Sequence, residues 1–104
     1  MEIIIRADSN KKIGTGHIVR AINLSKFFLK KKINSSILSR SSAEILKFSK
    51  TYENYFIKIN KNKSIKEEKK IILNILKKAK QPVFILDVLN YVIYQDLVKE
   101  LEKY

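Results

Sequence analysis

Two continuous apolar runs constrain the fold of this chain more than any other feature of its sequence. The segments EIIIRAD at residues 2–8 and PVFILDV at residues 82–88 are rich in β-branched and other apolar residues, and neither alternates apolar with polar positions. Such strands are typical of a parallel sheet, in which helices cover both faces. We therefore expect the first run to form a buried strand and the second to form a central strand of the same sheet.

Between the two runs, segments with helical periodicity alternate with segments typical of strands. Over 17–31 and 64–79 apolar residues recur every three or four positions, as on the buried face of a helix. The first of these stripes consists of Ile18, Ala21, Ile22, Ser25, Phe28 and Leu29. Weaker patterns predict strands at 33–40 and 54–60, and helices at 42–52 and about 93–104. This order predicts an α/β fold, a Rossmann-like parallel sheet with helices on both faces.

The two glycines of the chain, Gly14 and Gly16, lie together in the polar loop after the first strand. In an open parallel sheet, ligands bind at the carboxyl ends of the strands, where this loop is expected. Glycine allows close approach of the main chain, and the N–H groups that begin the next helix favour phosphate. The sequence therefore predicts a phosphorylated ligand at residues 14–18, held by Gly14, Thr15, Gly16 and Ile18.

Two common phosphate motifs do not fit this loop. A dinucleotide fingerprint requires a third glycine at position 19, which is Val19. A P-loop requires Gly-Lys-Ser/Thr, whereas Gly16 is followed by His17. A tight strand-to-helix turn also favours glycine, so a purely structural role for the pair stays open.

The single histidine of the chain, His17, directly follows the glycine loop. A neutral imidazole can accept a proton from water at cytoplasmic pH, and the start of a helix disfavours its cationic form. His17 is therefore a candidate general base beside a bound phosphate ester or sugar diphosphate. The alternative is a surface histidine without a role.

Four charged residues are expected near the same edge of the sheet. Arg6 and Asp8 end the first strand, where they brace the loop, orient His17 or contact substrate. Arg20 lies one helical turn beyond His17 and faces either phosphate or solvent. Asp87 ends the 82–88 strand, where it caps a loop or helix or contacts the ligand. All four are candidate substrate-binding residues.

Composition narrows the classes of partner and location. The formal charge is +12, but 19 of the 22 basic residues are Lys, and Lys, Ile and Asn are the residues that AT-rich codons encode. Nucleic-acid surfaces favour the planar fork of Arg, so we expect no nucleic-acid partner. There is no cysteine, no signal-peptide pattern, no apolar run long enough to span a membrane, and no cluster with metal-ligand spacing. We expect a cytoplasmic protein without a metal or cofactor.

The segment IIIRADSNKKIGTGHIVRAINLSKFF, residues 3–28, resembles the start of the UDP-2,4-diacetamido-2,4,6-trideoxy-β-L-altropyranose hydrolases of pseudaminic acid biosynthesis. This family is also described as spore coat polysaccharide biosynthesis proteins. This segment and the family share, in the same order, a strand, the motif Arg-x-Asp, a short loop, the motif Ile-Gly-x-Gly-His-x-x-Arg and a helix. The matching positions are Arg6, Asp8, Ile13, Gly14, Gly16, His17 and Arg20. VFILDVLNY is similar to the family's strand ending in aspartate, here Asp87, although Val88 and Leu89 stand where an aromatic residue often follows.

The resemblance implies a GT-B architecture of two Rossmann-like domains with a UDP-sugar substrate between them. It implies hydrolysis to UDP and free sugar, with the histidine at position 17 as general base and no metal. Residues 1–104 correspond to a partial N-terminal domain, without the nucleotide-binding C-terminal domain. We therefore expect the chain to be a poor catalyst alone, and a companion polypeptide carrying that domain is a candidate partner. A GT-B glycosyltransferase fragment and a non-catalytic remnant or binding subunit remain alternatives.

Overall fold

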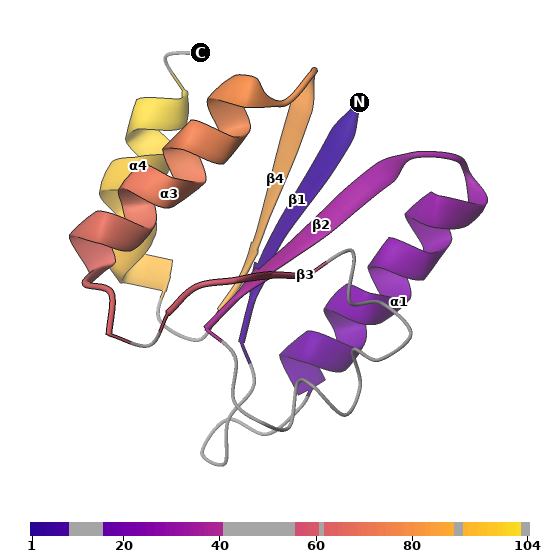
Figure 1. Cartoon of the computed structure of the whole chain (residues 1–104), viewed down its shortest axis with the longest axis horizontal. Coiled ribbons are helices and arrows are strands. Elements are labelled where there is room, and N and C mark those ends of the chain that lie inside the picture. The colour runs from indigo at the N-terminus through magenta and orange to yellow at the C-terminus, as the bar shows by residue number, and fades with distance from the viewer. Residues whose placement is uncertain (9–15, 41–55, 61, 89–90, 103–104) are drawn as a thin grey trace.

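Four parallel strands form one sheet in the order β3-β2-β1-β4, and helices lie on both of its faces (Figure 1). The computed structural model describes residues 1–8, 16–40, 56–60, 62–88 and 91–102. The elements along the chain are β1 (Glu2–Ala7), α1 (Gly16–Lys30), β2 (Asn34–Ser39), β3 (Phe56–Lys58), α3 (Ile65–Lys78), β4 (Pro82–Asp87), the 3₁₀ turn η2 (Tyr91–Tyr94) and α4 (Gln95–Leu101). The α/β, Rossmann-like sheet with helices on both faces is therefore confirmed.

The isoleucine run of β1 lies in the middle of the sheet, where it is buried from both sides. Ile3, Ile4 and Ile5 are at most 3% exposed. Ile5 lies opposite Ile37 of β2 on one side and Ile85 of β4 on the other. Successive side chains of a strand point to opposite faces, so a strand covered by helices on both faces needs apolar residues at every position. The absence of alternation in the sequence follows from this position.

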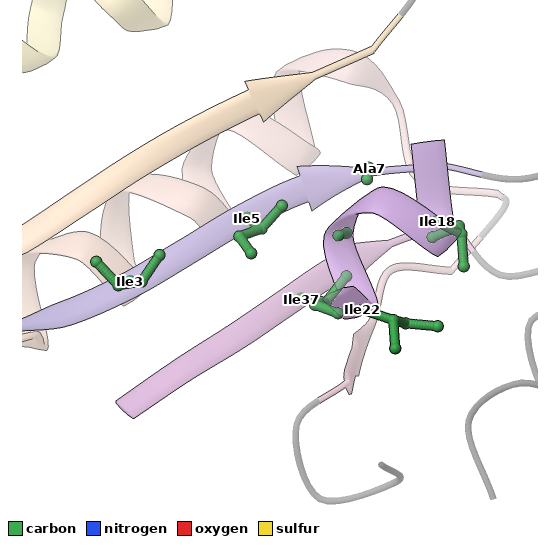
Figure 2. Packing of buried hydrophobic residues seen from close by; sticks show 7 residues of the cluster. Ile3, Ile5, Ala7, Ile18, Ile22 and Ile37 are labelled. Carbon is green, nitrogen blue, oxygen red and sulfur yellow. The ribbon is translucent and has the colours of Figure 1, made fainter. Parts of the chain in front are cut away.

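One core lies between the sheet and α1. Ile3, Ile5 and Ala7 of β1 point toward this helix, which packs its own apolar stripe against them (Figure 2). The buried members of this cluster are Ile3, Ile5, Ala7, Ile18, Ala21, Ile22 and Ile37. Fully burying one such branched side chain contributes roughly 1.5–3 kcal/mol, so this face is a main source of stability. The predicted stripe is wrong at Leu29, which is 46% exposed near the end of the helix.

A second core lies on the opposite face, between the sheet and α3 with α4. Its buried members are Ile4, Leu38, Ile59, Ile72, Leu76, Tyr94 and Leu97. The start of α3 is where the sequence predicts it. Ser64 accepts a hydrogen bond from the Glu67 amide while Glu67 bonds back to the Ser64 main chain, which forms the capping box.

Two further predictions about the elements need correction, and another lies outside the described residues. The 82–88 run is not a central strand: within the described sheet β4 is at the edge, next to β1 alone. The last helix does not begin near residue 93, because η2 occupies residues 91–94 and α4 starts at Gln95. Residues 42–52, predicted as a short helix, fall outside the described part of the chain.

Candidate functional site

The order of the strands places a change of direction between β1 and β4. From β1 the chain runs outward through β2 to β3, and it then returns to the other side of β1 to form β4. At such a switch point the connections leave neighbouring strands in opposite directions, and ligands bind in the crevice at the carboxyl ends. Asp8 follows β1 and Asp87 ends β4 at this edge. The candidate site is therefore the carboxyl edge of β1 and β4 with the start of α1.

Arg20 and Asp87, two of the predicted site residues, form an ion pair with two hydrogen bonds. Arg20 Nε lies 2.8 Å from Asp87 Oδ2, and Arg20 Nη2 lies 2.9 Å from Asp87 Oδ1. The hydrogen bonds to Asp87 raise the pKa of Arg20. The Arg20 side chain is 61% exposed, so solvent screens the attraction, and the pair matters mainly for geometry. It ties the second turn of α1 to the end of β4 across the switch point.

Arg6, the other predicted arginine, is buried rather than exposed at the edge. Its side chain is 1% exposed and bonds Glu68 with Nε to Oε2 at 3.2 Å and Nη2 to Oε1 at 3.1 Å. Its remaining nitrogen, Nη1, lies 2.7 Å from Asp8 Oδ1. Burial lowers the pKa of Arg6, but the hydrogen bonds to Asp8 and Glu68 outweigh burial and leave that pKa raised. The buried guanidinium therefore orients Asp8 from below.

Asp8 is held by three donors on a single carboxylate oxygen. Asp8 Oδ1 accepts from Arg6 Nη1, from the Ser39 hydroxyl at 3.2 Å and from the Arg40 amide at 2.9 Å. Among the described residues no hydrogen bond reaches Oδ2, and the side chain is 23% exposed. Three directional contacts fix the orientation of the carboxylate, so Asp8 is a preorganised acceptor at the carboxyl ends of β1 and β2.

Glu68 is the centre of this network. It lies in the first turn of α3 with a side chain that is 0% exposed, and it also accepts from Arg40 Nε at 2.6 Å. The Tyr94 hydroxyl donates a further hydrogen bond to it. Burial alone raises the pKa of Glu68, but the bonds from Arg6, Tyr94 and Arg40 leave it lowered. A buried carboxylate with this set of donors stays ionised and compensates the buried arginine.

Tyr94 closes the network from the side of η2. Its ring lies under the Arg6 guanidinium, with 5.9 Å between Arg6 Cζ and the ring centroid. Burial and the hydrogen bond to Glu68 raise the pKa of Tyr94. A neutral phenol that donates to a carboxylate and lies against a cation completes a desolvated cluster without net charge.

The sequence did not predict Ser39, Arg40, Glu68 or Tyr94 as part of this edge. For Glu68 a signal exists, because Glu68, Ile72 and Leu76 recur at four-residue spacing and all three are buried on the same face of α3. A glutamate within an apolar stripe is a residue that needs a buried cationic partner. For the others no local pattern is informative, since their partners are far away in the sequence.

The glycine loop and His17 are only partly described. Gly14 and Thr15 lie outside the described residues, as does the side chain of His17. Gly16 is the first residue of α1 and His17 the second, so the helix starts where the sequence predicts it. Ile18 is 0% exposed in the core against β1, and a ligand could therefore meet it only through the main chain.

The described residues contain neither a metal-binding cluster nor a membrane-spanning helix. There, no group of three or more His, Cys, Asp or Glu side chains comes close enough to hold a metal ion. None of the helices in the same ranges is long and apolar enough to cross a membrane.

Comparisons with known proteins do not assign the chain to a family, so its class is described from its fold and its site alone. No protein family, curated protein or solved structure matches this sequence or its fold. What is established is a Rossmann-like parallel sheet with an ion-paired carboxyl edge.

Proposed function

We propose that this chain binds the diphosphate of a nucleotide sugar at the carboxyl edge of its sheet and contributes the general base that hydrolyses it. In this proposal the chain is the N-terminal, GT-B-type part of a UDP-sugar hydrolase of surface-glycan synthesis. The support is the sequence pattern from Arg6 to Arg20 together with the position of the corresponding elements at a switch point.

The observation that carries the proposal is the Arg20–Asp87 pair. It joins α1 to β4 by two hydrogen bonds, so the start of α1 is held against the carboxyl edge. Free N–H groups at the start of a helix attract phosphate, and a helix fixed in place loses little freedom on binding. Asp8, fixed through Oδ1, leaves an acceptor for a sugar hydroxyl or for an imidazole N–H.

The chemical step follows from these roles. The imidazole of His17 takes a proton from water, and the water oxygen bonds to the anomeric carbon. The bond from that carbon to the diphosphate oxygen breaks, and its electron pair leaves with UDP. The helix N–H groups stabilise the negative charge on the departing diphosphate. A glycosyltransferase would use a sugar hydroxyl in place of water, and the fold does not separate these two reactions.

Binding without turnover is the second candidate function. Each arginine of the chain is paired with a carboxylate: Arg6 with Glu68 and Asp8, Arg20 with Asp87, and Arg40 with Glu68. Among the described residues, the negative charge that develops on the leaving group would therefore be stabilised by main-chain amides rather than by an arginine, because each arginine already binds a carboxylate. Such a site is suited to holding a diphosphate more than to accelerating its departure.

The test separates binding, hydrolysis and transfer. The chain is titrated with UDP-N-acetylated 6-deoxy sugars, and amide shifts of residues 14–18 are followed by NMR. UDP and free sugar are then quantified without an acceptor, with the chain alone and with any co-purifying polypeptide. We expect shifts at residues 14–18 and, where turnover occurs, free sugar. Shifts without products favour the binding role, products that require a sugar acceptor favour transfer, and unperturbed amides contradict the proposal.

The His17→Ala variant tests the assigned base. A general base contributes about 10² to 10⁴ in rate, so we expect turnover to fall by at least a hundredfold while UDP-sugar binding persists. Lys30→Ala, at the far end of the same helix, is the matched control and should leave turnover unchanged. Unaltered turnover in His17→Ala would exclude this residue as the base.

A further inference from the structure

Within the described sheet, the outer side of β4 is an unpaired apolar edge. β4 pairs with β1 along its whole length, from Glu2 opposite Pro82 to Ala7 opposite Asp87, and no described strand lies on its other side. Val83 is 42% exposed, and Phe84, Ile85 and Leu86 are only partly buried. An edge strand presents main-chain hydrogen-bonding groups without a partner strand, and in β4 these groups lie beside apolar side chains.

The opposite edge of the sheet is protected, which makes the β4 edge distinctive. β3 has only three residues and ends in the exposed Lys58. Short strands and lysines are the usual devices that prevent edge-to-edge pairing. β4 has six residues, with Pro82 at its first position, where proline does not interrupt a strand, and four consecutive apolar residues after it. It lacks those devices from Val83 to Leu86.

Apolar surface is also present on the helices of both faces. On one face α1 presents Val19, Leu24 and Phe27, of which Phe27 is 54% exposed. Arg20, which belongs to the same patch, bonds Asp87, so the first turns of α1 lie near the end of β4. On the other face, a groove of about 740 Å³ runs between β4 and the two helices, lined by Leu73, Leu76, Lys77, Ala79, Gln81, Pro82, Phe84 and Leu101.

We propose that a second copy of this chain pairs with the β4 edge, antiparallel and about a two-fold axis perpendicular to the sheet. Such an axis keeps each face of the sheet on its own side. The groove beside α3 and α4, which includes Pro82 and Phe84 of β4, then lies on the same side of the joined sheet as the groove of the partner copy. An isologous contact of this kind is closed, and it joins the two four-stranded sheets into one.

The distribution of charge favours a second copy at this place. Residues 1–80 contain 20 of the 22 basic residues and six acidic ones, whereas residues 81–104 contain two basic and four acidic residues. A chain of net charge +12 repels its own copies, and β4 and α4 belong to the segment with the fewest basic residues. Antiparallel pairing also places the Asp87 end of one strand opposite the Pro82 end of the other, beside Lys80, whereas parallel pairing would oppose Asp87 to Asp87.

The test is the mass of the whole chain in solution by analytical ultracentrifugation, with Val83→Lys as the disrupting variant. We expect the wild type to sediment as a dimer of 12.2 kDa chains at high protein concentration, more completely as salt rises. Val83→Lys should weaken dimerisation by at least about tenfold, because it places two lysines in the interface. Ile57→Lys, a matched change on the opposite edge strand at 37% exposure, should leave the dimer intact.

A second measurement keeps the proposal testable if the variant folds poorly. In the wild type, hydrogen exchange of the β4 amides should slow with rising protein concentration, while exchange in β3 should not change. A monomer at every concentration would overturn the proposal, as would a dimer that survives in a folded Val83→Lys protein. Open-ended polymers would also overturn it, because two-fold pairing is closed.

Discussion

At the residue scale, the buried carboxylate of Glu68 joins three segments that are far apart in the sequence. It bonds Arg6 at the end of β1, Arg40 after β2 and Tyr94 in η2. Because Arg6 in turn orients Asp8, the geometry of the candidate site depends on a residue that never reaches solvent. Removing one member of such a cluster leaves a buried charge with too few partners. The resulting loss of folding stability is larger than the net stability that the intact ion pair adds.

The Glu68→Gln substitution is expected to destabilise the fold strongly. An amide keeps the volume of the side chain but removes the buried negative charge and leaves Arg6 with Asp8 as its anionic partner, which should lower the free energy of unfolding by about 3–5 kcal/mol. Chemical denaturation followed by circular dichroism measures this change. Glu100→Gln, on the exposed side of α4, is the control and should change stability by less than about 0.5 kcal/mol. Equal effects of the two changes would contradict the central role of Glu68.

The lowered pKa of Glu68 also predicts how stability responds to acid. The carboxyl group is stabilised in its ionised form by Arg6, Tyr94 and Arg40, whereas in the unfolded chain it titrates near its ordinary value of about 4.3. The contribution of Glu68 to the free energy of unfolding is therefore complete above the pKa of the unfolded state. It is lost as the pH falls through the lowered pKa of the folded state. Stability of the wild type should drop on acidification below about pH 4, and in Glu68→Gln the drop should be smaller. A variant with the same acid slope as the wild type would show that other carboxylates cause it.

At the element scale, α1 ends in a turn that normally requires glycine. The Ile33 amide donates to the Phe28 carbonyl and the Lys32 amide to the Leu29 carbonyl, each at 2.9 Å, the two bonds of a Schellman motif. Lys32 has φ of 60°, in the left-handed region. Phe28 and Ile33 both pack against the core of this face, as the motif requires. The apolar contact therefore determines this helix end despite an unfavourable residue at the turn.

Lys32→Gly should stabilise the protein. A residue with a Cβ in the left-handed region costs roughly 1–2 kcal/mol, and the entropy that glycine adds to the unfolded chain offsets part of the gain. We expect the free energy of unfolding to rise by about 0.5–1 kcal/mol in thermal or denaturant melts. Lys30→Gly, two residues earlier within α1, should have the opposite sign because it weakens a helical position. A loss of stability in both variants would contradict the left-handed turn.

At the scale of the whole molecule, charge acts over the full width of the fold. The principal extents are 36 × 33 × 18 Å, and the net charge is +12. The Debye length is about 30 Å at 0.01 M salt and about 8 Å at 0.15 M. At low salt each lysine therefore repels most others in the molecule, whereas at physiological salt only neighbouring groups interact. The surface ion pairs are too weak to offset a repulsion of this range.

Salt should therefore stabilise the folded monomer. Raising sodium chloride from about 0.01 to 0.15 M should increase the free energy of unfolding, measured at protein concentrations where ultracentrifugation finds no dimer. A variant with Lys66→Gln and Lys70→Gln, two exposed positions of α3, should show a shallower dependence. Stability that falls as salt rises would mean that attractive ion pairs dominate over net repulsion.

The sequence determined the elements because their causes are local. Apolar runs mark β1 and β4, three- and four-residue spacing marks α1 and α3, and the Ser64 and Glu67 spacing marks a helix start. The order of these elements also predicted the parallel class of the sheet. At the candidate site, the same reasoning placed Asp8, Arg20 and Asp87 at one edge, because parallel strands share their carboxyl end.

Only the tertiary structure decided which residues meet and which strand lies outermost. Arg6 and Glu68 are 62 positions apart, and no local pattern encodes their pairing. The apolar sequence of β4 is compatible with a central strand and with an edge strand. Hydrophobicity indicates that a strand can be buried, but the strands and helices that pack against it determine how much of it is buried. Pairing between strands is a long-range choice, made by the packing of the whole sheet.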